Sequence, residues 1–274
     1  MRGIFPVTVV VLTGVALGFL MLPIAAIFLR LPPGEVLTAL GSDVALDALR
    51  VTAATTLVAQ VVIVVVGTPA AYVLATCRFR GRELALTLTE LPLVLPPAVA
   101  WIGLLAAFGR VGVLGGELEA LGLAIPFTRL AVILAIVFVA GPFYVRTAVA
   151  AFAAVDQTLV DASRTLGASE ARTFFRIHIP LAGGGLGAGL ALSFARGIGE
   201  FGATIMFAGS LQGVTQTLSL AVYEQFDVDF DTALAIGAEL VLVSAAVLLL
   251  VKAVPRWRRS TSSWGIPSAA STSR

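Results

Sequence analysis

The chain has 274 residues, of which 58% are hydrophobic and 12% are charged, and its formal net charge at pH 7 is +2. A soluble globular protein carries about 25% charged residues, so this composition cannot provide a solvated surface. Together with a mean hydropathy of +1.00, it excludes a soluble domain and predicts an all-α integral membrane protein.

Apolar runs long enough to cross a bilayer follow one another along the chain, separated by charged or Gly/Pro-containing connections. A helix needs roughly 20 apolar residues to cross the hydrocarbon core. We expect six spans, at 6–29, 48–76, 86–108, 129–151, 180–206 and 232–254. The first is interpreted as a span because its apolar part is longer than that of a secretory signal and no small-residue cleavage site ends it. The spans form one transmembrane domain, 1–259, and the Ser/Thr-rich tail, 260–274, is predicted to be disordered.

Positive charges are distributed unevenly between the two sides of this topology. With a cytoplasmic N-terminus, only four of the 18 Lys and Arg residues fall on the outer side, namely Arg30, Arg50, Arg110 and Arg129. Arg196 lies inside a span, and the other thirteen are on the inner side. Because cytoplasmic loops carry an excess of Lys and Arg, we expect a multi-pass protein of the plasma (cell inner) membrane with both termini in the cytoplasm.

Two of the predicted spans contain residues that bend a helix or let it pack closely against another helix. The prolines of the third span, Pro92, Pro96 and Pro97, should kink it, either as a gate hinge or as a purely structural bend. The run from Gly183 to Gly189 resembles a phosphate loop but has no Lys-Ser/Thr after it. Close helix packing through the pairs Gly183/Gly187 and Gly185/Gly189 explains this run better.

One cytoplasmic loop, 146–179, is long and polar. The i, i+3, i+4, i+7 spacing of a single helical face is formed there by Leu159, Ala162, Ser163 and Leu166. Gly167 favours the left-handed conformation that ends a helix, and Ser169 can cap a second helix through Phe175. Pro180 suits the first turn of the fifth span. We therefore expect two short helices, joined at Gly167, outside the bilayer core.

The periodicity of this loop leaves two interpretations open. A helix with small residues at Ala162 and Ser163 can approach a partner closely and insert into a groove of another protein. The alternative is an amphipathic loop that rests against its own bundle or the lipid interface.

The spacing of the loop also resembles the signature loop of the ATP-binding-cassette (ABC) importer permeases. Their pattern is Glu-Ala-Ala, three residues, Gly, nine residues, and Ile-x-Leu-Pro. Here Asp161-Ala162-Ser163 is followed after three residues by Gly167, and after nine more by Ile177-His178-Ile179-Pro180. The departures from the pattern are conservative in size or charge.

The resemblance covers nearly the whole chain, because six spans with a long loop before the fifth are also typical of type I importer permeases. It implies a membrane-spanning, non-catalytic subunit that forms a homodimer. Its implied partners are a cytoplasmic ABC ATPase dimer, an extracytoplasmic oxyanion-binding protein and membrane lipid, with no nucleic acid. We assign ATPase docking to Leu159 and Leu166 of the predicted helical face and to the motif residues Asp161, Ala162, Ser163, Gly167, Ile177 and Pro180.

The sequence lacks the elements that ATP hydrolysis and metal binding require. It contains no Gly-x-x-x-x-Gly-Lys-Ser/Thr loop, and its one lysine, Lys252, follows an apolar span without phosphate-cradling glycines. ATP hydrolysis therefore has to occur on a separate subunit. A single cysteine, Cys77, and a single histidine, His178, cannot form a Cys/His metal cluster, so we expect neither a metal site nor a cofactor on this chain.

The segment 192–223 resembles the permeases of tetrahedral oxyanions. Its sequences GEFGATIMFAG and TQTLSLAVY are most similar to the molybdate permeases, and tungstate is a near-isostere. Sulfate permeases share the core FAR-x-x-GEFG and remain the alternative. The resemblance therefore implies inward transport of molybdate or tungstate.

A dianion needs a polar path across the membrane, because its transfer into a low-dielectric core costs tens of kcal/mol. The ionisable pair Arg196 and Glu200 lies in the predicted fifth span and is a candidate for this path. Alternatively, Arg196 and Glu200 form an ion pair with a purely structural role. This is the other interpretation because Glu200 would repel an anion unless Arg196 neutralises it. Hydrogen-bond donors of an outer gate could come from Thr204, Thr215 and Gln216, although helix-end and loop hydrogen bonds explain these equally simply.

Two other classes of protein fit this sequence less well. A secondary transporter or channel would work without an ATPase and would need an ion-coupling carboxylate site. An intramembrane enzyme would need a nucleophile with a base, or a metal cluster, and the sequence shows neither.

Overall fold

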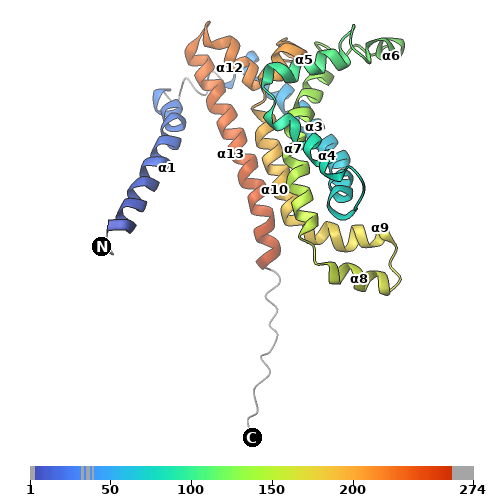
Figure 1. The fold of residues 1–274 in the computed structure, drawn as a ribbon. Helices are drawn as coiled ribbons and strands as arrows, with labels where there is room; N and C mark the ends of the chain where they lie inside the picture. The colour runs from blue at the N-terminus through green and yellow to red at the C-terminus, as the bar shows by residue number, and fades with distance from the viewer. Residues whose placement is uncertain (1–3, 32–33, 35–37, 39, 261–274) are drawn as a thin grey trace.

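A computed structural model describes the backbone of residues 4–31, 34, 38 and 40–260. The regular structure of these residues is entirely helical, as predicted. The helices, labelled as in Figure 1, are α1 (Ile4–Arg30), α3 (Asp43–Thr76), α4 (Arg82–Val94), α5 (Pro97–Phe108), α6 (Gly115–Ala120), α7 (Arg129–Ala153), α8 (Gln157–Thr165), α9 (Glu170–Thr173), the π-helix η1 (Phe174–His178), α10 (Ile179–Ile198), α11 (Gly202–Ala208), α12 (Leu218–Phe226) and α13 (Phe230–Ser260).

Within the described ranges, five helical segments are long and apolar enough to cross a membrane: Val7–Arg30, Asp43–Thr76, Arg129–Ala153, Glu170–Ile198 and Phe230–Leu250. A bent pair of helices, α4 and α5, makes up to six crossings if it counts as one span. The predicted class, an all-α membrane protein with several spans, is confirmed. The predicted tail, 260–274, lies outside the described residues except for Ser260.

The third predicted span, 86–108, is not one kinked helix. The helix axis bends by 116° between α4 and α5. Leu95 and Pro96 between them are extended, with ψ angles of 132° and 143°. Two consecutive prolines cause this break, because Pro96 and Pro97 donate no backbone hydrogen bond and disfavour helical geometry at the residue before each.

The fifth predicted span, 180–206, is shifted along the chain. It begins earlier, because the helix runs unbroken from Glu170 through η1 into α10. In η1 the backbone N–H of Ile179 donates to the carbonyl of Phe174, five residues back. This wide turn precedes Pro180, which has no N–H to donate to Arg176. The span ends at Ile198, where the chain breaks before the short helix α11.

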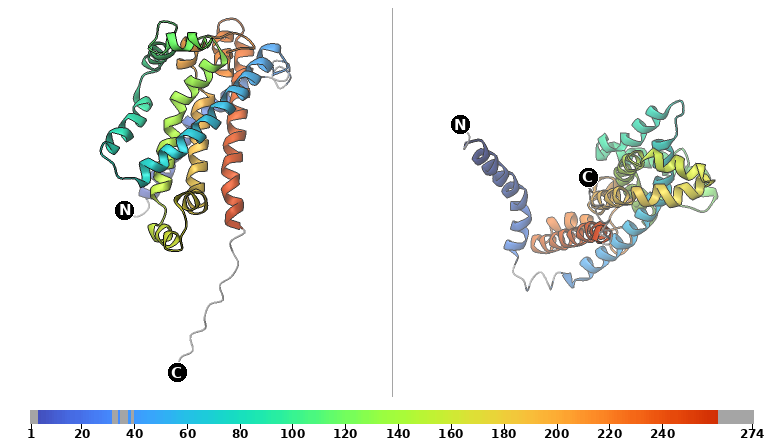
Figure 2. Two further views of the ribbon diagram at one scale, coloured as in Figure 1. Left: turned by 90° about the vertical axis from the view of Figure 1, so that its right-hand side faces the viewer. Right: turned by 90° about the horizontal axis from the view of Figure 1, so that it is seen from below.

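Helix α7 lies at the centre of the bundle, packed between α3 and α10 (Figures 1 and 2). Tyr144 of α7 is buried, and its hydroxyl lies 2.6 Å from that of Thr68 on α3. The contact with α10 is also close: a Cβ at Gly189 would lie 3.1 Å from Thr147 Cβ, and one at Gly197 would lie 2.9 Å from Ile136 Cγ2.

The glycine run at the start of α10 packs through one of its two predicted pairs. A Cβ at Gly185 would collide with Ala151, and Gly189 meets Thr147, so the role of this pair is confirmed. At Gly183 and Gly187 an added Cβ would have no atom within 4 Å, so the prediction for them is wrong. The run spans almost two helical turns, and only the glycines on the α7 side can contact that helix.

Helix α1 stands away from the rest of the molecule (Figures 1 and 2). In its 24-residue apolar segment, Val7–Arg30, no residue is buried. It approaches the bundle at its C-terminal end, where the guanidinium carbon of Arg30 lies 5.4 Å from the ring centroid of Phe230 on α13. An apolar helix without protein contacts along its length needs lipid or another protein chain around it.

The packing of α10 on α7 predicts opposite effects for two alanine substitutions in the same helix. Gly185→Ala should lower the free energy of unfolding by about 1–3 kcal/mol, because its methyl group overlaps Ala151. The matched control, Gly187→Ala, adds a methyl group in open space and should be neutral or stabilising by up to about 1 kcal/mol. Thermal unfolding in detergent measures both, and equal stability of the two variants would contradict the packing.

Candidate functional site

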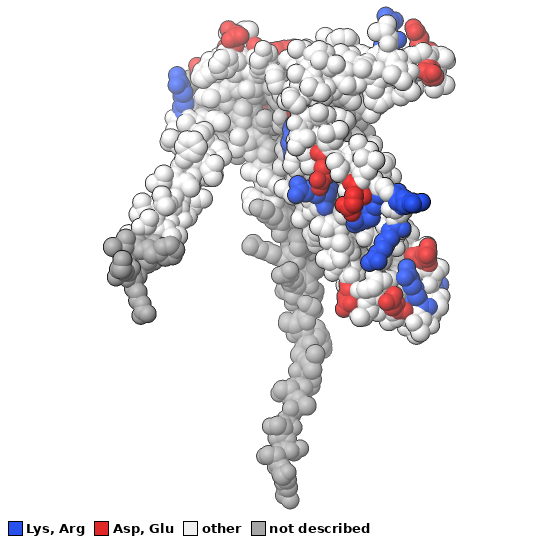
Figure 3. Space-filling view, viewed as in Figure 1, with Lys and Arg blue, Asp and Glu red and all other residues white. Residues whose placement is uncertain are grey.

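Charged side chains gather at two ends of the molecule, and the described part of α13 between them is nearly uncharged on the face shown in Figure 3. One end, called the α8 end below, contains α8, α9 and the start of α4 (Figure 1). The opposite end, called the α6 end, contains α6, α11 and α12. The predicted docking residues lie at the α8 end, and the predicted pathway residues lie towards the α6 end.

Helix α8 is capped at both ends by residues of its own loop. Asp156 caps its start and accepts hydrogen bonds from the backbone N–H of Thr158 at 2.9 Å and from the Thr158 hydroxyl at 2.8 Å. These bonds, the backbone one first, hold the pKa of the Asp156 carboxyl below its usual value. Because the folded pKa is depressed, this cap stabilises α8 above the unfolded pKa and is lost as the pH falls through the folded one.

Gly167 ends α8 as predicted, with a φ of 77°. Its N–H donates to the carbonyl of Arg164 at 2.9 Å, and the N–H of Ala168 donates to Ser163 at 3.0 Å. These two bonds form the Schellman motif, in which the left-handed residue turns the chain back and satisfies the last carbonyls of the helix. Ser169 then caps α9 by accepting from the N–H of Arg172 at 3.3 Å.

The apolar face predicted on α8 is mostly uncovered. Leu159 is 47% exposed and Leu166 is 88% exposed, and Ala162 between them is exposed. Ser163 instead turns towards α9, where its hydroxyl lies 3.0 Å from that of Thr173. The buried contact of α8 with its own protein is made by Val160, which the predicted face did not include.

The other predicted docking residues lie in different environments. Asp161 is exposed and pairs with Arg164 at 3.9 Å. Ile177 is half-buried in η1, and Pro180 is exposed at the start of α10. Asp161 therefore lies on α8, whereas Ile177 and Pro180 belong to the helix that follows the loop.

An aromatic cluster fixes the base of the loop to the bundle. His178 is buried, and its ring lies edge-on to Tyr72 of α3 at 4.9 Å and to Phe152 of α7 at 6.3 Å. Phe174 also packs edge-on against Tyr72, with centroids 4.7 Å apart. Helices α3, α7 and η1 thus meet on one set of rings.

Arg196 and Glu200 form an ion pair of 2.7 Å, but Glu200 lies in the break after α10 and not inside a span as predicted. The Glu200 carboxylate also accepts the backbone N–H of Ala203 at 2.7 Å, so it caps α11. Its backbone carbonyl accepts the Ser219 hydroxyl of α12 at 2.8 Å. Because the Glu200 side chain is only 2% exposed, these contacts fit the structural interpretation of the pair well.

The three predicted gate residues are all buried near this junction. Thr204 lies on α11, and its hydroxyl has no hydrogen-bond partner in the described part of the chain. Thr215 accepts the N–H of Leu211 at 2.9 Å, which holds the loop 209–217 in shape. Gln216 donates to the carboxylate of Glu224 on α12.

Arg129 contributes to this junction from the first turn of α7. Its guanidinium donates to the carbonyls of Gly213 at 2.7 Å and Val214 at 3.3 Å. It therefore ties the loop that carries Thr215 to the central helix, a contact that the sequence does not reveal because 84 residues separate the partners.

Sequence reasoning also missed a polar stripe on α3, formed by Thr52, Thr56 and Gln60. The Thr52 hydroxyl caps α12 by accepting from the N–H of Leu218 at 2.8 Å. Thr56 and Gln60 have no side-chain partner among the described residues, and they line a cavity of about 440 Å³ between α3, α10 and α13. The four-residue spacing of the stripe places it on one helical face and would have identified it.

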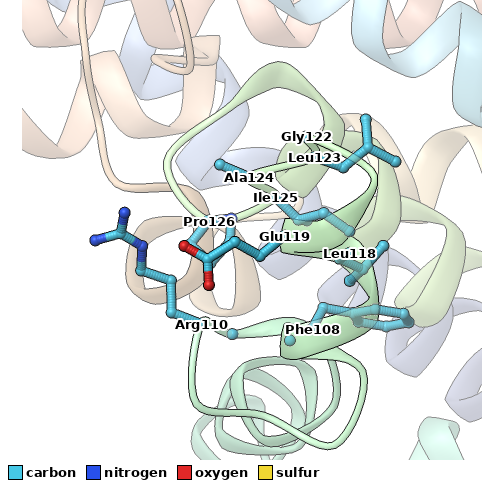
Figure 4. Close-up of a pocket in the computed structure, with 11 residues that line it drawn as sticks. Phe108, Arg110, Leu118, Glu119, Gly122, Leu123, Ala124, Ile125 and Pro126 are labelled. Atoms are coloured by element: carbon cyan, nitrogen blue, oxygen red, sulfur yellow. The ribbon is translucent and has the colours of Figure 1, made fainter.

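A smaller cavity of about 200 Å³ opens at the α6 end (Figure 4). It lies between the end of α5, helix α6 and the segment 122–126, and its charged lining residues are Arg110 and Glu119. None of the predicted site residues lines it. The described residues contain no group of three or more His, Cys, Asp and Glu side chains that could hold a metal ion.

The two contacts of the Glu200 carboxylate predict different results for two substitutions. Glu200→Ala removes the cap and the ion pair and should cost about 1–3 kcal/mol of stability. Glu200→Gln keeps an oxygen that can accept from Ala203, so its melting temperature should stay closer to that of the wild type. A Glu200→Ala variant as stable as the wild type would show that the carboxylate is not a structural cap.

Comparisons with known proteins support the ABC permease interpretation. Residues 63–260 match the family described as binding-protein-dependent transport system inner membrane component. The molybdenum transport system permease protein ModB of Mycobacterium bovis is 42% identical over 237 residues, which cover 86% of this chain and 89% of that protein. A probable molybdenum ABC transporter permease protein of Haloferax volcanii is 37% identical over 246 residues, or 89% and 88% of the two chains.

A sulfate transport system permease protein, CysT of Synechocystis, is 32% identical over 219 residues, covering 80% of this chain and 77% of that protein. Among solved structures, a chain of a bacterial alginate ABC transporter, in complex with alginate pentasaccharide-bound periplasmic protein, superposes with a TM-score of 0.75 over 96% of both chains. At 15% identity this likeness shows the fold alone.

The family match spans more than half of the chain and includes α7, the loop with α8 and α9, and the junction at Glu200. The predicted resemblance to the ABC importer permeases is confirmed. The chain therefore belongs to the family of inner membrane components of binding-protein-dependent transport systems.

Proposed function

We propose that this chain is the membrane-spanning subunit of an ATP-driven importer that carries molybdate, or the near-isosteric tungstate, into the cell. The observation that carries the proposal is the apolar stripe of α8, a helix that is capped at both ends and holds Leu159 and Leu166 away from its own bundle. A rigid helix with uncovered leucines is suited to a groove on another protein.

The partner of this stripe is the ATPase. The chain has no phosphate loop of its own, so energy from ATP has to reach it through a protein contact. Leu159, Ala162 and Leu166 would insert into the ATPase, while Asp161 and Arg164 remain at the edge as a polar rim. This arrangement agrees with the usual anatomy of a protein interface, an apolar centre with charged residues around it.

The uneven distribution of arginine indicates how the subunit is oriented in the membrane. The α8 end carries Arg78, Arg82, Arg164 and further arginines of the loop, so it faces the cytoplasm together with both termini. The α6 end then faces outward, towards an extracytoplasmic binding protein. This orientation places the ATPase-docking stripe on the side where ATP is available.

A second copy of the chain completes the pathway. The uncovered α1, with no buried residue in its apolar segment, supports a homodimer in which α1 contacts the partner subunit. ATP binding would bring the two α8 helices together and open the path outward, and hydrolysis would return it to the inward state.

The substrate assignment rests on the relatives and is consistent with the polar groups inside the bundle. The relatives named for molybdenum transport are 42% and 37% identical to this chain, whereas two sulfate relatives are 32% and 34% identical. The buried polar atoms of Thr56, Gln60 and Thr204 have no hydrogen-bond partner among the described residues, so these uncharged groups would be free to bind a dianion once the path opens. Sulfate is the second candidate, because it is tetrahedral and divalent too.

Reconstitution in liposomes with the cognate ATPase and binding protein tests the proposal. Binding protein loaded with molybdate should stimulate ATP hydrolysis and uptake, whereas the same protein offered sulfate at equal concentration should not. Stimulation by sulfate alone would contradict the substrate, and uptake that continues without the ATPase would favour a secondary transporter.

A further inference from the structure

A further cavity, lined mainly by polar side chains, lies at the α8 end, where α3 and α7 finish. Its volume is about 720 Å³, and it is bounded by the corner between α3 and α4, the corner between α7 and α8, and η1. Its polar lining comes from Thr76, Cys77, Arg78, Arg82, Gln157 and His178. None of the contacts proposed for ATPase docking or for the pathway uses these side chains.

The lining is positively charged and is not neutralised from within. It includes two arginines and no Asp or Glu among the described residues. Arg82 is partly engaged, since its Nε donates to the carbonyl of Leu74 at 2.7 Å and its Nη1 contacts the exposed Glu83 carboxylate at 2.7 Å. Arg78 is exposed and makes no hydrogen bond or ion pair with any described residue. An anion is the ligand that this charge balance favours.

The same cavity has an apolar side. Phe152, Ala153 and Val155 line it from the end of α7, and Ala75 lines it from the end of α3. His178, buried between these walls, has an Nδ1 atom without a hydrogen-bond partner in the described structure. A cavity that is basic on one side and apolar on the other suits an amphiphile better than a fully hydrated ion.

The position of the cavity indicates the source of such a ligand. Thr76 and Ala153 are the last residues of two membrane-spanning helices, so the cavity lies at the height of the membrane surface. The inner leaflet carries anionic lipids, and basic pockets between spans on that side bind their headgroups. We propose that this cavity binds the phosphate headgroup of an anionic phospholipid of the cytoplasmic leaflet. The inference takes from the proposed function only that the α8 end faces the cytoplasm.

The bound headgroup would connect three parts of the chain between which no direct hydrogen bond is found among the described residues at this point. At the corner between α3 and α4, Arg78 lies in the connection and Arg82 begins α4, whereas Gln157 begins α8 and His178 ends η1. A phosphate held by these groups would therefore brace the base of the docking loop against α3. The free oxyanion substrate shares the tetrahedral charge of a phosphate but lacks acyl chains, which gives a way to separate the two ligands.

The single cysteine of the chain gives a direct measure of occupancy, because Cys77 is exposed and lines the cavity. The full chain is placed in nanodiscs of phosphatidylcholine containing increasing fractions of phosphatidylglycerol, and Cys77 is alkylated with a water-soluble maleimide. Phosphatidylglycerol should slow the alkylation of the wild type. In Arg78→Gln the lipid fraction needed for half of this effect should rise about fivefold, as expected for the loss of one cationic contact.

The matched control is Arg80→Gln, which removes an equal charge from the same connection but does not line the cavity. It should respond to phosphatidylglycerol like the wild type. Equal responses of Arg78→Gln and Arg80→Gln, or no slowing of the wild type, would overturn the site. If molybdate or inorganic phosphate slowed the alkylation equally in pure phosphatidylcholine, the ligand would be a free oxyanion, and the lipid assignment would be wrong.

This experiment is independent of transport, since it contains no ATPase and no binding protein. A chain that transports molybdate but shows no lipid protection of Cys77 would refute only the lipid site. A chain with lipid protection but without ATP-driven transport would refute only the proposed function.

Discussion

The close contact between α10 and α7 is the interaction on which the rest of the structure depends. Gly185, Gly189 and Gly197 let the two helices approach so closely that a single methyl group at Gly185 would collide with Ala151. In a bilayer such packing has to come from shape, because lipid chains are as apolar as leucine side chains and provide no hydrophobic driving force between helices. With α10 held in this way, the elements at its two ends have fixed positions relative to the centre of the bundle.

Those two ends are the regions to which we assign function. The helix is continuous from Glu170 to Ile198, so one element reaches from the docking loop to the junction at Glu200. At the first end the Ser163 hydroxyl lies 3.0 Å from that of Thr173 and links α8 to it. At the other end Arg196 pairs with Glu200, whose carboxylate caps α11. In the proposed importer, movement of α8 by the ATPase would therefore act on the junction through a single helix.

The sequence predicted the features that depend on local chemistry. Gly167 and Ser169 were identified as the end and the start of helices, and the structure has them in these roles with the expected backbone geometry and hydrogen bond. How strongly a local signal bends or breaks a helix was not predictable in the same way, and neither was the long-range contact of Arg129 with Gly213, 84 residues away. The 116° bend between α4 and α5 exceeds the kink expected from proline, and η1 carries the helix through Pro180, where a start was expected. Glu200 looked like an intramembrane charge, and only the position of Ala203 shows that it is a cap.

Helix α8 is the proposed contact for the ATPase, and the affinity of the purified ATPase for the detergent-solubilised chain is a direct measure of this contact. Leu166 is 88% exposed, so Leu166→Ser leaves the packing of the chain intact while it removes an apolar anchor from the stripe. Leu121→Ser is the matched control, because Leu121 is 74% exposed at the α6 end. We expect Leu166→Ser to raise the Kd at least about tenfold and Leu121→Ser to leave it unchanged. Equal Kd values for the wild type and both variants would contradict the proposed contact.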